Sequence, residues 1–314
     1  MPERARRLLP RFLVPCAYFA LAAAVFATNG IPTERGTLSV WILGGLLCLS
    51  LGSLSSFFRS LLLEWLPLLA ALTLYDVLRG IGTGHMPIHA DFQIWLDKYV
   101  FGFGSVPSVW LQQHLWHPSH VSIVDYAAFG TYMSYFLVTP FALGALWLID
   151  RPLFRSYARR LTLLSFAAVA WFTACPTMPP WLASQKHLIG SVQRLNNSIA
   201  PNNGWFDPTA LWERGVNLAN DLAAFPSLHE GMTILFSIML WRRVRPVFRT
   251  VLVAYPLAMA FSLVYLGEHY VSDLVAGAAL TAAVCYAEPR LVRAFLKRWR
   301  TRARTHAEPA PELA

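Results

Sequence analysis

Long apolar stretches recur along the chain, separated by shorter polar stretches. Each apolar stretch is continuous and lacks the alternation of apolar and polar positions that is typical of a membrane β-barrel strand. A helix needs roughly 20 such residues to cross the hydrocarbon core of a bilayer. The pattern therefore predicts an all-α fold, a polytopic transmembrane bundle of about eight helices. The expected spans are residues 12–28, 38–58, 61–81, 123–149, 161–175, 228–241, 251–267 and 269–286.

The composition agrees with a membrane protein. Of the 314 residues, 56% are hydrophobic and 14% are charged, whereas about a quarter of a soluble domain is charged. The net charge is +9, but the basic residues lie beside apolar spans, so we expect a bilayer and no nucleic acid as partner. The four cysteines lie in or at the ends of spans without a Cys-x-x-Cys motif, which predicts neither a disulfide framework nor a zinc site.

The distribution of basic residues predicts the orientation. If the eight expected helices alternate in direction, 20 of the 26 Lys and Arg residues fall on one side, which the positive-inside rule makes cytoplasmic. Both termini are then cytoplasmic, and the high Ala and Arg content favours a bacterial plasma membrane. The first apolar stretch also has features of a signal peptide, but it is long for one, and we expect a retained helix.

The spans divide the chain into regions. Residues 1–60 form two N-terminal helices, 61–289 a catalytic membrane domain, and 290–314 a basic tail that we expect to be disordered after Arg300. Two long segments face the extracytoplasmic side. The aromatic content of segment 82–122 predicts helices in the membrane interface, and segment 176–227 has the length of a functional lid.

Two short motifs carry the candidate chemistry. Pro226-Ser227-Leu228-His229 opens the sixth span, and His269 and Asp273 open the eighth. Four residues apart on a helix, His269 and Asp273 would share one face. All three ionisable groups then lie on the extracytoplasmic side, where such groups in a membrane are functional candidates.

Other polar groups are expected at the same depth. Asp76 and Arg79 lie at the outer end of the third span, and Tyr132 and Tyr135 lie in the outer half of the fourth. Two histidines, a carboxylate and an arginine suit phosphoryl transfer. One imidazole attacks phosphorus, the second protonates the leaving alkoxide, and the carboxylate orients the nucleophile. Cations bind the equatorial oxygens, and this set of residues requires no metal or other cofactor.

These motifs resemble those of the type 2 phosphatidic acid phosphatase (PAP2) superfamily. Pro226-Ser227-Leu228-His229 is similar to its second motif, Pro-Ser-Gly-His, and the run from Ser262 to Asp273 is similar to its third, Ser-Arg-x5-His-x3-Asp. The resemblance implies a helical bundle with a six-helix core and a site near one membrane face. It also implies that His269 is the nucleophile, Asp273 its orienting partner and His229 the general acid.

The departures from the family motifs concern the phosphate clamp. Leu228 replaces the glycine, Leu263 replaces the arginine, and the first motif, Lys-x6-Arg-Pro, is absent. The pattern is more similar to the inositol phosphorylceramide synthase branch, which moves a phospho-headgroup between lipids. Arg79 is the preferred replacement for the clamp, since it is mounted on a helix beside Asp76. Further candidates for binding the phosphate are Ser227, Lys186, Arg194, Arg214 and Lys98.

Three functions remain open at this point. The first is a lipid phosphatase or phosphotransferase that acts on a phospholipid or lipid phosphate through a phosphohistidine. The second is a metal-dependent membrane hydrolase with a two-His-one-carboxylate site. The third is a phospholipid transporter or binding protein, which the absence of paired half-repeats disfavours. Glu230 and Glu268 flank the histidines and are expected to be solvated or helix-end charges.

Overall fold

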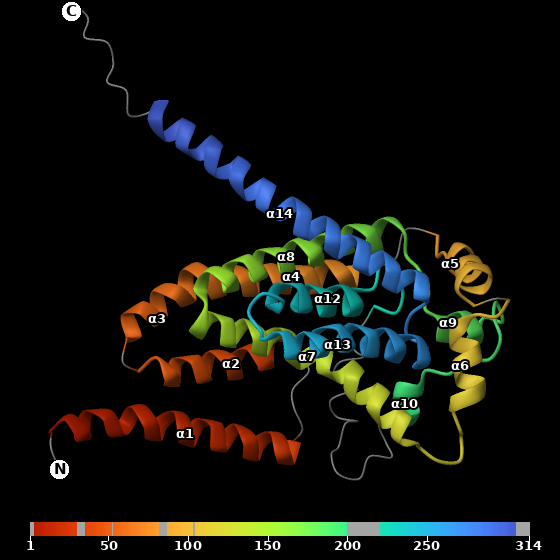
Figure 1. The fold of residues 1–314 in the computed structure, drawn as a ribbon, viewed down its shortest axis with the longest axis horizontal. Coiled ribbons are helices and arrows are strands. Elements are labelled where there is room, and N and C mark those ends of the chain that lie inside the picture. The colour runs from red at the N-terminus through yellow and green to blue at the C-terminus, as the bar shows by residue number, and fades with distance from the viewer. Residues whose placement is uncertain are drawn as a thin grey trace, which may run out of the picture.

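The protein is described from a computed structural model, which covers residues 3–29, 35–51, 53–81, 87–102, 104–199 and 220–305. Within these ranges every regular element is helical, and only isolated bridges join His89 to Thr177 and Thr177 to Ala223. The chain is therefore an all-α polytopic helical protein, as its apolar pattern predicts (Figure 1).

Elongated helices form the bundle (Figure 1). In chain order, they are α1 (Glu3–Asn29), α2 (Arg35–Leu49), α3 (Leu54–Ser60), α4 (Leu66–Ile81), α7 (Ile123–Ile149), α8 (Arg151–Ala174), α12 (Leu228–Leu240), α13 (Pro246–Tyr265) and α14 (Val271–Thr305). A π-helical turn, η1 (Leu61–Trp65), joins α3 to α4. Helix α12 packs against α14, α13, α8 and α7, so it lies centrally.

Four helices of the described residues are long and apolar enough to cross a membrane. They are Leu54–Arg79, Ile123–Ile149, Pro246–Tyr265 and Val271–Trp299. Shorter apolar helices cover Leu13–Phe26, Thr37–Leu49 and Leu228–Leu240. An integral membrane protein accounts for these helices and for the large apolar side chains on the surface, such as Val40, Leu63 and Leu257.

Some expected span boundaries are wrong. The break expected between residues 58 and 61 is absent, because one helical run continues from Leu54 to Arg79. The chain breaks earlier, after Leu49, where serine and glycine interrupt the apolar run. Helix α8 begins at Arg151 rather than at residue 161, since Asp150 accepts a hydrogen bond from the backbone N–H of Leu153 and caps it (3.0 Å). Helix α14 continues through Thr305, beyond the expected start of disorder, and projects past the bundle (Figure 1).

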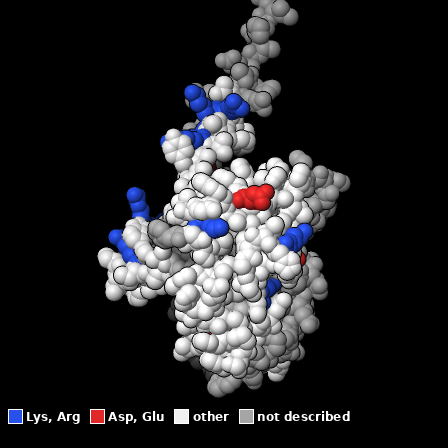
Figure 2. Space-filling model, turned by 90° about the vertical axis from the view of Figure 1, so that its right-hand side faces the viewer, with Lys and Arg blue, Asp and Glu red and all other residues white. Residues whose placement is uncertain are grey.

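Short helices gather at one end of the bundle (Figure 1). They are α5 (Asp91–Leu96), the π-helical turn η2 (Asp97–Phe101), α6 (Pro107–Leu115), α9 (Pro180–Gln185) and α10 (Leu195–Ile199). Viewed from this end, charged side chains are sparse, and Lys and Arg side chains gather on the projecting part of α14 (Figure 2). Phe92, Trp95 and Tyr99 are exposed on α5 and η2. This composition is typical of helices in a membrane interface, the position expected for segment 82–122.

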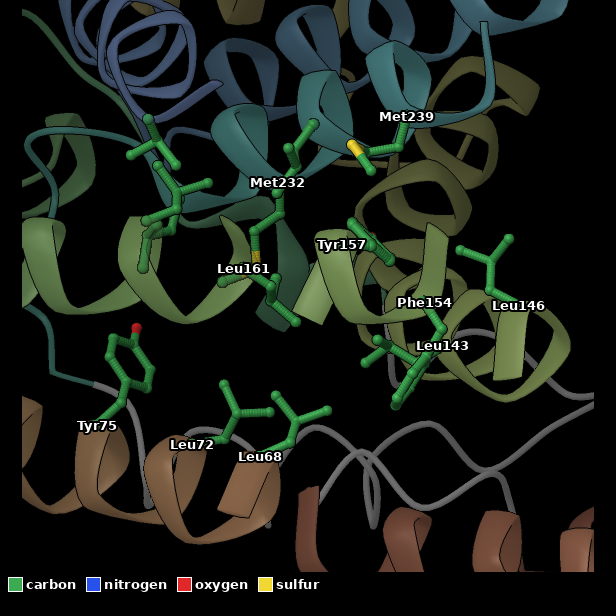
Figure 3. Close-up of a cluster of buried hydrophobic side chains, with 14 of the residues drawn as sticks. Leu68, Leu72, Tyr75, Leu143, Leu146, Phe154, Tyr157, Leu161, Met232 and Met239 are labelled. Atoms are coloured by element: carbon green, nitrogen blue, oxygen red, sulfur yellow. The ribbon is translucent and has the colours of Figure 1, made fainter. Parts of the chain in front are cut away.

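The main apolar core joins several helices of the bundle (Figure 3). Leu68 and Leu72 of α4, Leu143 of α7, Leu161 of α8 and Met232 of α12 are all buried in it. Met232 lies three residues after His229, so this core also supports the start of α12. The core thereby holds the helices on which the candidate site is mounted.

Carboxylates bind the basic cluster at the opposite end of the bundle. Glu64 accepts hydrogen bonds from Arg151 (2.7 Å) and Arg155 (2.6 Å). Buried Glu288 accepts them from Arg159 (2.6 Å) and Arg160 (3.2 Å). These ion pairs join α8 to η1 and α14, so the arginines stabilise the bundle as well as marking one of its ends.

Candidate active site

Two histidines and an aspartate form a row at the end of the bundle that carries the short helices. Nδ1 of His229 lies 3.3 Å from Nε2 of His269, and Nδ1 of His269 lies 3.3 Å from Oδ2 of Asp273. His269 is 5% exposed and Asp273 is fully buried. The three residues expected from the motifs are therefore in direct contact, and one nitrogen of His269 faces a carboxylate while the other faces a second imidazole.

The contact between His269 and Asp273 differs from the expected one. His269 lies before α14, which begins at Val271, so the two residues do not share a helix face. Asp273 is in the first turn of α14 and accepts a hydrogen bond from the backbone N–H of Tyr270 (2.9 Å). The carboxylate therefore spans the helix start, binding the backbone of Tyr270 and the ring of His269 with the same oxygen.

His229 is placed by the capped start of α12. Ser227 precedes the helix, and its Oγ accepts a hydrogen bond from the backbone N–H of Glu230 (3.4 Å). The backbone N–H of Ser227 donates to the carbonyl oxygen of Asp273 (3.0 Å). The starts of α12 and α14 are thus joined by a hydrogen bond, which explains why the two histidines lie close together.

Glycine allows these two helices to approach closely. A Cβ added at Gly277 of α14 would lie 2.3 Å from the carbonyl oxygen of Ser227. Thr281 then donates a hydrogen bond from Oγ1 to the carbonyl oxygen of Gly231 in α12 (2.9 Å). The spacing of the histidines depends on this contact, because any side chain at position 277 would push the helices apart.

The turn before His269 requires glycine as well. Gly267 has φ of +79°, and an added Cβ would lie 2.8 Å from the carbonyl oxygen of Gln193. The carbonyl of Gly267 accepts a hydrogen bond from the backbone N–H of Trp181 (3.2 Å). The segment after α8 thereby holds the turn that presents Glu268 and His269.

Aromatic side chains of α7 surround His229. The ring centroid of Tyr135 lies 4.3 Å from that of His229, and the centroid of Tyr132 lies 5.2 Å away. Phe136 adds an edge contact at 6.2 Å. The expected supporting tyrosines are therefore in contact with the second histidine, where they restrict its ring orientation and reduce its exposure to water.

Two arginines act on this part of the site. The charge of Arg79, near the end of α4, acts on His229 and Tyr132, and Asp76 interacts electrostatically with Arg79. The charge of Arg194, just before α10, also acts on Tyr132. Arg79 and Arg194 come from segments 115 residues apart in the sequence, and both influence the tyrosine that packs on His229.

Arg194 is held beside the residue that precedes His269. Its Nε and Nη2 donate to the two carboxylate oxygens of Glu268 at 2.8 and 3.3 Å, and Asn196 donates to the same carboxylate at 2.7 Å. Burial lowers the pKa of Arg194, but the charge and hydrogen bond of Glu268, together with Tyr132 and Asp221, outweigh this effect and the pKa is raised. The expectation of a solvated Glu268 is wrong, since the carboxylate is 8% exposed and paired. Glu230 lies at a helix end as expected, in the first turn of α12, but it is buried rather than solvated.

The remaining clamp candidates are less closely associated with the histidines. Lys186 is exposed at the end of α9, and Lys98 packs its ammonium 5.3 Å from the ring centroid of Tyr99. Ser227 is engaged in capping α12, and its contact with phosphate stays a prediction, as does that of Lys186. Arg214 lies outside the described residues.

A buried aspartate completes the helix start and was not singled out by the sequence. Asp97, the first residue of η2, accepts hydrogen bonds from the backbone N–H groups of Val271 (2.7 Å) and Ser272 (3.0 Å). Burial raises the pKa of Asp97, and those N–H groups oppose the shift. No sequence signal marks this contact, because the partners are 174 residues apart.

The fold and the site together define a helical integral-membrane protein in which two histidines and an aspartate meet at one end of the bundle. The sequence pattern of the PAP2 superfamily matches residues 103–287, more than half of the chain. The chain belongs to the PAP2 superfamily.

One characterised relative indicates the branch of the family. The inositol phosphorylceramide synthase catalytic subunit aur1 of Schizosaccharomyces pombe is 28% identical over 170 residues. The match covers 52% of this chain and 40% of that protein, so the chain spans less than half the length of this relative. No solved structure matches the chain.

Proposed function

We propose that the protein transfers phosphate or a phospho-headgroup from a lipid through a phosphohistidine at His269, on the extracytoplasmic face of the membrane. The observation that carries this proposal is the row of Asp273, His269 and His229. Asp273 orients His269 so that its Nε2 is directed at His229. Phosphorus enters between the two imidazoles, which lie too close for it at 3.3 Å and must first separate.

The reaction takes two steps. In the first, Nε2 of His269 attacks phosphorus, the bond from phosphorus to the donor oxygen breaks, and His229 gives a proton to the leaving alkoxide. In the second, His229 takes a proton from the acceptor hydroxyl, whose oxygen attacks phosphorus and releases His269. Water as acceptor makes the enzyme a phosphatase, and a lipid or polyol hydroxyl makes it a transferase. A phosphodiester donor leaves its headgroup on the phosphohistidine, as inositol phosphorylceramide synthesis requires.

Arg79 and Arg194 replace the cations of the missing first motif. Arg194 is held by Glu268, which directly precedes His269, and Arg79 lies in the last turn of α4, so both are placed to stabilise the equatorial oxygens of the transferred group. Glu268 and Asn196 hold Arg194 in place before substrate binds, which lowers the entropic cost of binding.

The extracytoplasmic face is supported by the ends of the bundle. The site is at the Arg79 end of α4, whereas Glu64 and the arginines of α8 lie at the other end. Basic residues collect on the cytoplasmic side of membrane proteins, which supports a site on the opposite side.

The arrangement of the three residues also argues against a metal site. His229 faces Nε2 of His269, while Asp273 faces Nδ1 on the other side of the same ring. The donors therefore lie in a row and do not surround one point, as the ligands of a two-His-one-carboxylate metal do.

We expect turnover of a lipid phosphate panel to resist EDTA. Loss of turnover in EDTA, restored by a divalent metal, would favour the metal-dependent hydrolase, and lipid binding without turnover would favour a transporter.

Substitution of Asp273 tests its orienting role. Asp273→Asn keeps an acceptor for the N–H of Tyr270 but removes the charge that holds His269, and turnover is expected to fall roughly ten-thousand-fold, as for a triad aspartate. The measurement is kcat on phosphatidic acid, with exposed Asp91 changed to Asn as the control. A decrease of less than about tenfold would contradict the orienting role.

An apolar cavity next to the site fits a lipid chain. Its volume is about 70 Å³, and Tyr135, Phe136 and Met232 line it together with Leu38 and Ile42 of α2. Tyr135 and Phe136 also contact His229, so the cavity and the site share two side chains. We propose that it accepts part of the donor's hydrocarbon chain.

Filling this cavity is expected to weaken binding of long-chain lipids only. Ile42→Trp should raise KM for a long-chain phosphatidic acid about tenfold, since about two methylenes at ~0.8 kcal/mol each lose their contacts. KM for a dibutyryl analogue should stay unchanged. The control is Val40→Trp on the same helix, because Val40 is 70% exposed and faces away from the cavity. An equal rise in KM for both chain lengths would contradict the proposal that the cavity binds a hydrocarbon chain.

A further inference from the structure

We propose that Asp97 is a positioning residue for catalysis, which holds the start of α14 so that His269 and Asp273 stay aligned. This inference rests on the proposed function of the same site. Asp97 lies before residue 103, where the match to the family begins. It belongs to the short helices at the end of the bundle and not to a membrane-spanning helix.

The carboxylate of Asp97 forms hydrogen bonds with the first turn of α14. This carboxylate is fully buried and accepts the N–H groups of Val271 and Ser272 with separate oxygens. The first N–H groups of a helix have no partner within the helix. Asp97 and Asp273 divide these donors between them, because Asp273 accepts the N–H of Tyr270.

The position of the helix start determines the geometry of the catalytic row. His269 lies two residues before Val271, and Asp273 lies two residues after it. A shift of this turn therefore moves the nucleophile and its orienting partner relative to His229, which is mounted on α12. A displacement of about 1 Å at reacting groups costs roughly a hundredfold in rate.

Charge strengthens the same contact. The start of a helix carries partial positive charge, which a carboxylate complements. An asparagine at position 97 would lose this charge and would direct an amide N–H₂ group at a backbone N–H donor. Asp97→Asn therefore loosens the helix start while the size of the side chain is kept.

The experiment compares Asp97→Asn with Asp125→Asn. Asp125 is also fully buried at a helix start, where it accepts the N–H of Ser122 (2.6 Å) and the hydroxyl of Tyr265, but it contacts neither histidine. Both variants should lower Tm. Asp97→Asn should also lower kcat on phosphatidic acid by roughly a hundredfold with little change in KM, and Asp125→Asn should leave kcat near the wild-type value. Equal losses of kcat at equal losses of Tm would overturn the proposal.

A second variant removes the same interaction from the other side. Val271 is the first residue of α14, a position where proline is compatible with a helix. Val271→Pro deletes one N–H that Asp97 accepts, and kcat should fall while the helix is retained. An unchanged kcat in this variant would contradict the proposal even if Asp97→Asn fails to fold.

Hydrogen exchange separates this proposal from the proposed function. In Asp97→Asn, the amides of residues 271 and 272 should exchange faster than in the wild type, whether or not a substrate is known. If the wild type turns over no lipid phosphate, the proposed function fails, and hydrogen exchange still reports whether Asp97 stabilises the start of α14. If the wild type is active and the amides exchange at the wild-type rate in Asp97→Asn, the positioning role fails alone.

Discussion

His269→Ala is expected to abolish turnover of every lipid phosphate while the protein remains folded. Nε2 of His269 is the atom that would form the bond to phosphorus, so the variant lacks the covalent step. The imidazole is largely buried, but its removal leaves the contacts of Asp273 with Tyr270 and of Asp97 with α14 in place. The measurement is release or transfer of labelled phosphate from phosphatidic acid, with size-exclusion profile and Tm as the test of folding.

A nearby histidine serves as the control for this substitution. His114 is exposed on α6 and bonds only to the carbonyl oxygen of Trp110, one turn earlier, among the described residues (2.7 Å). His114→Ala should keep wild-type turnover. Activity in His269→Ala above about 1% of the wild type would show that another group attacks phosphorus.

His229→Ala is expected to abolish turnover of lipid substrates but to spare the first chemical step on an activated substrate. An alkoxide needs a proton to leave, which His229 provides, whereas 4-nitrophenolate leaves without one. With 4-nitrophenyl phosphate, the variant should release about one equivalent of nitrophenol per protein and then stop, since deprotonation of water also requires His229. Stopped-flow absorbance measures this burst.

The burst distinguishes the roles of the two histidines. His269→Ala should show no burst with the same substrate. A burst from His269→Ala, or the absence of a burst from His229→Ala, would contradict the assignment of nucleophile and general acid.

Several spans and the meeting of the candidate histidines were predictable because both depend on local sequence. Continuous apolar runs predict helices at residues 123–149 and 228–241, and the structure has α7 at Ile123–Ile149 and α12 at Leu228–Leu240. The contact of His229 with His269 followed from placing both motifs on one side of the membrane. The break between α2 and α3 was misplaced, since hydropathy alone does not weigh the serines and glycine after Leu49 against the apolar residues that follow.

Long-range polar contacts were not predictable. Glu268 was expected to be a solvated or helix-end charge, but it pairs with Arg194, which lies 74 residues earlier in the sequence. The contact of Asp97 with α14 depends on how a short helix folds back against the bundle, which no period or motif encodes. In the structure, His269 precedes α14. The spacing of four residues therefore identified the right pair, although the two residues do not share a helix face.

Trapping the covalent intermediate tests the central claim most directly. Purified protein is mixed with ³²P-labelled phosphatidic acid in EDTA, quenched in alkali within the first turnover, and analysed for phosphoamino acids and by peptide mapping. The account predicts alkali-stable, acid-labile label on the peptide that contains His269, present in the wild type and absent from His269→Ala. Turnover in the wild type without any labelled protein, or label retained in His269→Ala, would contradict it.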